Sequence, residues 1–278
     1  MVRAKILSLA GATTLLSTVA FAADLPPPLP PPVYRPVVVE ATGWYLRGFV
    51  GQSNQFISNI SHPDFATAPQ FTFLDKGGFD SGMFGGGGVG YQWNNWFRVD
   101  ATIEYRGAVG FHALDRFFNP FFGGGRFDTN QYTASKSEWV GLINAYLDLG
   151  TWWCITPFVG AGFGVAYNKI EHFRDVNVIT AGGGWADTGT QTNFAWALHA
   201  GAAYKVTPSF AVELSYRYLN LGKAQTGLLV NLDPTVFSGN PLNPVTFNNL
   251  QSHDIMLSMR WMLQQDVPPP PPPLMRKG

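Results

Sequence analysis

The sequence contains one cysteine and few charged residues for its length. Cys154 stands alone among 278 residues, so no disulfide can form within the chain. It lies among turn residues, and we expect a buried or membrane-edge thiol. Charged residues make up 13% of the chain, about half the share that is usual in a soluble domain. Lys and Arg number 18, as do Asp and Glu, and this balance argues against a charge-driven partner such as nucleic acid.

Beyond its first 22 residues the sequence also lacks a long apolar run. No stretch there reaches the roughly 18 apolar residues that a transmembrane helix needs. The first 22 residues predict a secretory signal peptide: Arg3 and Lys5 precede an apolar run, and Ala20-Phe21-Ala22 is a small-x-small cleavage site. An uncleaved helix is the less favoured alternative, because the apolar run is short. We expect cleavage to remove two basic residues and to leave a net charge of −2, from 16 basic and 18 acidic residues.

The chain as a whole is rich in apolar residues, aromatic residues and glycine. Hydrophobic residues make up 46% of the chain and aromatic residues 15%, and there are 31 glycines. Two proline-rich segments, 23–41 and 265–278, flank the region 42–264, and such runs cannot join a β-ladder. We expect both to be periplasmic. The second is either a tether near peptidoglycan or an unstructured tail without a partner.

Eight segments of the flanked region have the alternation and the β-branched and aromatic residues of strands. They are 43–54, 81–94, 96–108, 137–149, 155–169, 191–205, 209–222 and 252–264. Each supplies the roughly 9–11 residues that a tilted membrane strand needs. Because lipid admits only helices and closed barrels, an exported apolar chain without a helix predicts a transmembrane barrel. A secreted β-protein is the alternative.

The connections between these segments alternate strictly between short and long. Short turns follow the second, fourth and sixth segments, while the long connections are 55–80, 109–136, 170–190 and 223–251. Short periplasmic turns and long external loops are typical of outer-membrane barrels. The sequence therefore predicts an all-β, eight-stranded antiparallel up-and-down transmembrane β-barrel with four long external loops.

Tryptophan and charge support the same arrangement. Six of the nine tryptophans flank the short turns or the chain ends, which predicts a periplasmic aromatic girdle. They are Trp44, Trp93, Trp96, Trp152, Trp153 and Trp261. Along the strands, charged residues alternate with apolar ones. If the apolar face meets lipid, the charged face lies in the lumen and pairs there.

The ten lumen candidates are five basic and five acidic residues. They are Arg47, Arg98, Asp100, Glu104, Arg106, Asp148, Glu213, Arg217, Asp254 and Arg260. An eight-stranded barrel is only wide enough to be filled by side chains, so we expect a lumen plugged by ion pairs and no aqueous pore. A gate built from the same pairs is the less favoured alternative.

Five short motifs resemble the opacity-type small outer-membrane β-barrels of alphaproteobacteria, a porin-family group with the OmpA-like fold. The motifs are AADLPPP at 22–28, GWYLRG at 43–48, TPFVGAG at 156–162, AGAAY at 200–204 and VELSYRYLNLG at 212–222. The resemblance implies a Gram-negative outer membrane with its lipopolysaccharide, insertion by the barrel assembly machinery, and a structural or surface-antigen role. Some relatives bind haemin.

The histidines leave a ligand-binding alternative open. His62, His112 and His172 fall in or beside three different external loops, and a metal or haem site needs ligands that converge. Solvated, unrelated histidines are the favoured interpretation, so we predict no cofactor and no metal. Three roles are open for the Phe-rich stretch 117–122: haemin contact, packing on the barrel lip, or contact with lipid or another cell surface.

A catalytic alternative rests on one strand pair. His199 with Ser215 and Glu213 imitates the residue set of a hydrolase, and some lipid A modifying enzymes are small barrels. The local histidine–serine signature of those enzymes is absent from the sequence. We therefore predict a non-enzymatic envelope protein that displays surface loops, with a haemin-binding barrel as the alternative and an enzyme as the least favoured.

Overall fold

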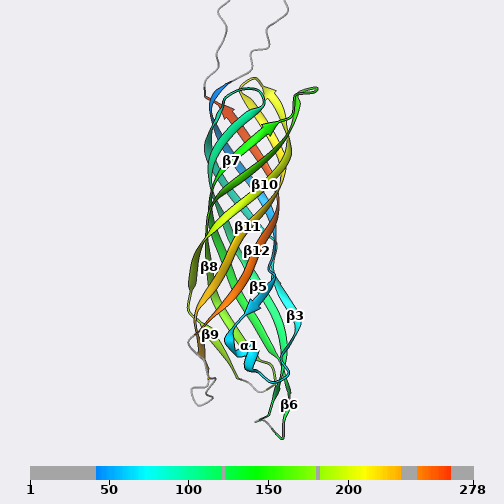
Figure 1. Cartoon of the computed structure of the whole chain (residues 1–278), viewed down its shortest axis with the longest axis vertical. Helices are drawn as coiled ribbons and strands as arrows, with labels where there is room; N and C mark the ends of the chain where they lie inside the picture. The colour runs from blue at the N-terminus through cyan, green and yellow to red at the C-terminus, as the bar shows by residue number, and fades with distance from the viewer. Residues whose placement is uncertain (1–41, 121–122, 180–181, 233–242, 264–278) are drawn as a thin grey trace, which may run out of the picture. The chain divides into compact units, whose positions relative to one another are not determined.

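The computed structural model describes residues 42–120, 123–179, 182–232 and 243–263. The signal peptide and both proline-rich segments of the sequence prediction lie outside these residues. The described chain forms twelve antiparallel strands and one short helix (Figure 1). Among the described residues, no helix is long and apolar enough to cross a membrane.

Eight long strands form a closed ring. They are β1 (Gly43–Phe56), β4 (Gly82–Gln92), β5 (Phe97–Asn119), β7 (Asn130–Asp148), β8 (Ile155–Asn177), β10 (Gly189–Thr207), β11 (Phe210–Asn231) and β12 (Pro244–Met262). Each pairs with the next in this order, and β12 pairs with β1, where Tyr45 lies opposite Met262. The all-β, antiparallel ring agrees with the sequence prediction.

Four short strands and the helix lie at one end of the ring, which we call the distal end. They are β2 (Asn59–Ser61), α1 (Pro63–Thr67), β3 (Thr72–Phe79), β6 (Arg126–Asp128) and β9 (Gly183–Ala186). The opposite, proximal end carries the three short turns, the start of β1 and the end of β12, and is uppermost in Figure 1.

The ring strands are longer than the sequence predicted. β5 and β8 each run for 23 residues, and much of what was expected to be long loops is strand. The reason is that the residue types on the two faces of the wall change part of the way along the strands. Inward-facing residues change from charged to apolar, and outward-facing residues change from apolar to polar. In β5 a register shift between Arg106 and Val109 inserts one extra residue, so the alternation changes phase there.

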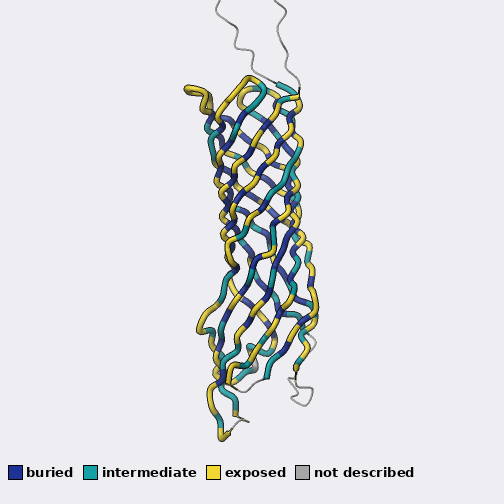
Figure 2. Tube along the Cα trace, turned by 180° about the vertical axis from the view of Figure 1, so that it is seen from behind, coloured by how far each residue is buried: buried dark blue, intermediate teal, exposed yellow. Residues whose placement is uncertain are grey.

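Burial alternates along the whole wall (Figure 2). In the proximal half, the outward residues are apolar, such as Ile103 and Ile255, and charged residues are buried inside among aromatic rings such as Tyr146. In the distal half the buried hydrophobic residues form one cluster that includes Phe79, Phe111 and Phe247. A wall surrounded by lipid and a wall surrounded by water require these opposite patterns.

A second set of aromatic rings, exposed except for the half-buried Tyr218, lies on the outer face, farther along the strands than the predicted girdle. Tyr105, Trp139 and Tyr167 are direct cross-strand neighbours on β5, β7 and β8. Trp196 and Tyr218 continue the set on β10 and β11, with ring centroids 5.3 Å apart. We call these five residues the distal aromatic band. Beyond it the outer face of β8 becomes charged, with Lys169 and Glu171.

One glycine shows why the proximal wall needs small residues. A Cβ on Gly90 would lie 2.3 Å from the ring of Tyr45, whose side chain crosses the inner face of the neighbouring strand. Tyr45 is fully buried and its hydroxyl donates a hydrogen bond to Asp100 (3.1 Å). The glycine therefore makes room for a lumen side chain.

Candidate functional site

The ten lumen candidates all lie on the inner face of the ring and are buried, at 5% exposure or less. A proximal cluster surrounds Glu213. Its carboxylate lies 3.3 Å from Arg47, 3.2 Å from Arg98 and 3.1 Å from Arg260. Two further carboxylates complete this cluster: Asp100 lies 3.1 Å from Arg47, and Asp148 lies 3.2 Å from Arg98.

A second cluster lies deeper in the ring. Arg217 bridges Glu104 and Asp254, each at 2.7 Å. Arg106 donates to both oxygens of Asp254, at 2.8 and 2.9 Å, and lies 3.1 Å from Glu104. Two-point contacts of this kind fix a guanidinium in one orientation, and hydrogen bonds are what make burial of paired charges tolerable.

Two members of the second cluster, Lys136 and Glu138, are not among the residues predicted from the sequence. Glu138 lies 2.9 Å from Arg106, and Lys136 forms an ion pair with Glu138 and a hydrogen bond with Gln55. Glu138 has the same parity as Asp148 on β7, so the alternation that identified Asp148 was also a signal for Glu138. With these two residues the two described clusters contain six cationic and six anionic side chains, which balance.

The six girdle tryptophans are exposed and lie at the proximal ends of the strands or in the proximal turns. Their exposed fractions range from 49% for Trp261 to 95% for Trp153. Cys154 follows Trp153 in the turn between β7 and β8, and its thiol is free and exposed. Of the two alternatives predicted for this thiol, burial is therefore wrong, while a position at the membrane edge, beside Trp153, stays a prediction.

The three histidines predicted in loops do not converge. His62 is buried at the start of α1, where its Nδ1 accepts from the backbone N–H of Asp64 and its Nε2 lies 3.2 Å from the carbonyl of Asn243. His112 is exposed on β5. His172 lines a different pocket from His62, and the described residues contain no cluster with the ligands for a metal ion.

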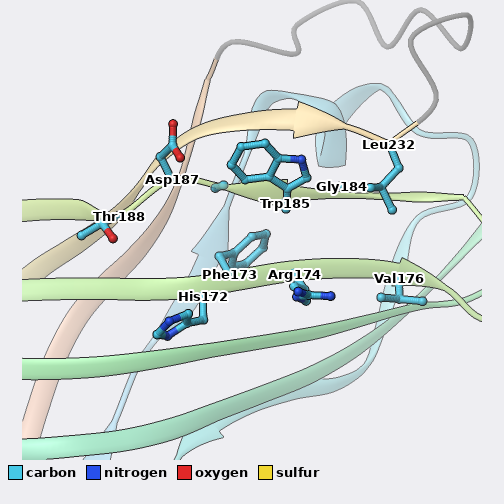
Figure 3. Close-up of a pocket in the computed structure, with 10 residues that line it drawn as sticks. His172, Phe173, Arg174, Val176, Gly184, Trp185, Asp187, Thr188 and Leu232 are labelled. Carbon is cyan, nitrogen blue, oxygen red and sulfur yellow. The ribbon is translucent and has the colours of Figure 1, made fainter.

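The pocket at His172 is a shallow hollow of about 470 Å³ between β8, β9 and the end of β11 (Figure 3). Trp185 and Asp187 lie on one side of it, opposite Arg174 and His172. Trp185 is 41% exposed, so the hollow is part of the outer surface.

The Phe-rich stretch divides between two environments. Phe117 lines a second pocket, next to α1. The Phe118 ring packs edge-on against Phe127, with the ring centroids 5.6 Å apart. Phe121 and Phe122 lie outside the described residues. These contacts support packing at the barrel lip over the haemin alternative.

The residues that imitate a hydrolase do not form its hydrogen bonds. The Nε2 of His199 lies 3.2 Å from Oδ1 of Asn144, while Ser215 Oγ has no partner within the described part of the chain. Glu213 is held by three arginines. The nucleophile–base contact that defines a triad is therefore missing.

Comparison with known proteins gives one family. The model of the outer membrane protein beta-barrel domain matches residues 10–258. An uncharacterized protein of Brucella abortus is 30% identical over 212 residues, covering 68% of this chain and 72% of the relative. The outer membrane protein PagN of Salmonella typhimurium is 30% identical over 194 residues, covering 65% and 75%.

Two further similarities concern surface proteins. A putative adhesin of Rickettsia conorii is 29% identical over 225 residues, covering 78% of this chain and 81% of the relative. Among solved structures, the Neisserial surface protein A is similar, with a TM-score of 0.41, 15% identity, and coverage of 80% of this chain and 99% of that one.

Proposed function

Because the chain belongs to the outer membrane protein beta-barrel domain family and resides in the outer membrane, we propose that it is a non-enzymatic surface protein whose plugged barrel holds a distal β-structure outside the cell. The observation that carries this proposal is the change in polarity of the inward- and outward-facing side chains along the strands. The proximal half of the barrel has the apolar outer face that suits lipid, and the distal half has the polar outer face that suits water.

The two aromatic sets support a membrane position. Tyr105 lies nine positions after Trp96 in the sequence. At about 3.3 Å per residue and a strand tilt of about 40°, they span about 23 Å along the barrel axis. This is close to the roughly 25 Å of apolar band in outer-membrane barrels. The proximal turns are then periplasmic and the distal end is external, in contact with lipopolysaccharide.

The native cysteine provides a direct test of this orientation. A membrane-impermeant maleimide applied to intact cells is expected to leave Cys154 unlabelled. It is expected to label a Lys76→Cys variant in a Cys154→Ser background, because Lys76 is exposed on distal β3. Labelling of Cys154 in intact cells, with Lys76→Cys protected, would reverse the proposed orientation.

The lumen clusters support a barrel that does not conduct. Twelve ionisable side chains lie in the proximal lumen and contact one another across the ring. In planar bilayers the refolded protein is expected to leave the baseline conductance unchanged. Stable, stepwise ion conductance by the wild-type protein would overturn the plugged barrel.

Surface contact is the specific role favoured by the hairpin that β6 forms with the distal end of β5. Phe127 on β6 is 42% exposed, and the guanidinium of Arg116 lies over its ring at 4.7 Å. An exposed aromatic side chain with a cationic neighbour is typical of a contact surface. The relative named a putative adhesin supports the same role. Expression in a non-adherent strain tests it: host-cell binding is expected with the wild-type protein and is reduced by Phe127→Ser. Equal binding by both would contradict a role for this hairpin.

A further inference from the structure

A second distal pocket, of about 210 Å³, lies among α1, β5, β7 and β8 at the distal end of the barrel. Five aromatic side chains line it, together with Leu229 of β11 and Val245 of β12: Phe65, Phe71, Phe117, Tyr132 and Phe173. The rings of Phe65 and Phe71 are stacked at 4.8 Å, and Tyr132 lies 6.0 Å from Phe173. These contacts hold the ring faces in place, so the pocket is a built feature of the fold.

One side of the pocket is polar, and it carries acceptors without donors. Asp175 lies directly opposite Tyr132 in the ladder between β7 and β8, and Asn130 lies two residues before Tyr132. Oδ1 of Asp175 and Oδ1 of Asn130 are both buried without a hydrogen-bond partner in the described residues. A buried acceptor without a partner is costly, so two of them beside one cavity indicate a ligand that donates.

The donors that surround these acceptors are already bonded elsewhere. The Tyr132 hydroxyl donates to Asp115, and the backbone N–H and side-chain amide of Asn130 also donate to Asp115. His62 is bonded to the start of α1 and to the carbonyl of Asn243. The pocket therefore offers acceptor oxygens, a carboxylate and aromatic faces, all of which attract a cation with N–H groups.

We propose that this pocket binds a small protonated primary amine with a compact apolar body, its ammonium group on Asp175 and Asn130 and its body between the Phe and Tyr rings. The volume equals about seven waters at roughly 30 Å³ each, which suits one ring with a short amine arm. A quaternary ammonium ion has no N–H for the two acceptors, and an anion is repelled by Asp175. This small-molecule site is additional to the proposed surface role and does not depend on it.

Calorimetric titration of the full chain in phospholipid nanodiscs tests the proposal, with 2-phenylethylamine as the probe. Saturable binding is expected for the amine, and at least tenfold weaker binding for 2-phenylethanol, which has nearly the same shape without the charge. Asp175→Asn is expected to weaken amine binding at least tenfold. The matched control is Asp187→Asn, a distal carboxylate at the other pocket, which is expected to leave the affinity unchanged.

A second variant covers the case in which Asp175→Asn does not fold. Phe71→Leu removes one face of the stacked pair and is expected to weaken amine binding several-fold. Each variant's folding is checked by the different gel mobility of boiled and unboiled protein. Equal affinity for amine and alcohol, unchanged affinity in Asp175→Asn, or saturable heat from Ca²⁺ with none from the amine would each overturn the proposal.

The pH dependence of binding gives a further test. Burial, and then the charge of Asp115, raises the pKa of Asp175 to about 7. The other titratable groups that line the pocket are Tyr132, His62 and Asp64, and Asp115 lies behind it, bonded to Tyr132 and Asn130. Since the ammonium group pairs with the ionised carboxylate, affinity is expected to fall about 30-fold from pH 8 to pH 5.5. His62→Gln is expected to keep this dependence. A flat profile in the wild-type protein would contradict the assignment.

Discussion

Ile103 and Phe111 lie eight residues apart on β5, yet Ile103 is 60% exposed on the outer face and Phe111 is 2% exposed inside. In a regular strand both would face the same side. The bulge after Arg106 separates a half that hides charges from a half that hides apolar rings. The surroundings of the wall, lipid or water, decide which kind of residue is turned inward.

The largest expected effect comes from the proximal interior. Glu213→Gln leaves Arg47, Arg98 and Arg260 without the carboxylate that they share. Breaking a buried ion pair in this way is expected to cost about 3–5 kcal/mol in the free energy of unfolding. Urea titration in phospholipid vesicles measures it. The control is Glu171→Gln, which removes a half-exposed pair with Lys169 and is expected to change stability by less than about 1 kcal/mol.

A substitution in the distal interior is expected to destabilise the distal half of the barrel alone. Phe111→Ala removes a ring that packs 5.1 Å from Phe79 and 4.9 Å from Phe247, at a cost of about 3 kcal/mol. Amide hydrogen exchange is expected to quicken in distal β5 and β7, while the proximal strands keep their protection. Equal loss of protection in both halves would show that the barrel unfolds as one unit. That result would contradict the division of the barrel into a proximal and a distal half.

Two outward-facing positions on one strand allow the outer faces of the two halves to be compared directly. Ile143 and Thr133 both point outward on β7, in the proximal and distal halves. Ile143→Arg is expected to cost about 2–3 kcal/mol, because the charge enters lipid near the midplane, while Thr133→Arg is expected to cost less than about 0.5 kcal/mol. The same urea titration compares them. Similar costs at the two positions would remove the argument for a water-exposed distal half.

The smallest expected effect is the pH dependence of distal stability. Because the pKa of Asp175 is raised in the folded state, the protonated form favours folding. This stability is present below about pH 4 and is lost as pH rises through about 7. Distal hydrogen exchange, corrected for its intrinsic rate, is expected to be faster at pH 8 than at pH 5. Asp175→Asn is expected to abolish that difference, and persistence of the difference would assign it to another group.

Local alternation was enough to predict the closed ring and the buried positions of Arg98 and Glu104. It was not enough for the distal half, because the phase change after Arg106 makes Val109 and Phe111 look like the start of a loop. The distal pocket was beyond sequence reasoning for another reason. His62, Phe117 and Asp175 come from three distant segments, and only the register between β7 and β8 brings Tyr132 opposite Asp175.

The distal aromatic band marks the level from which the distance between the bilayer and the amine pocket can be counted. Asp175 lies eight positions after Tyr167 on β8. At about 3.3 Å per residue and a tilt of about 40°, the pocket stands about 20 Å above the band. A molecule dissolved in the acyl chains therefore has no direct path to the pocket. Whatever fills the pocket arrives from the aqueous medium, so exchange with that medium, and not diffusion in the plane of the membrane, sets its rate of access.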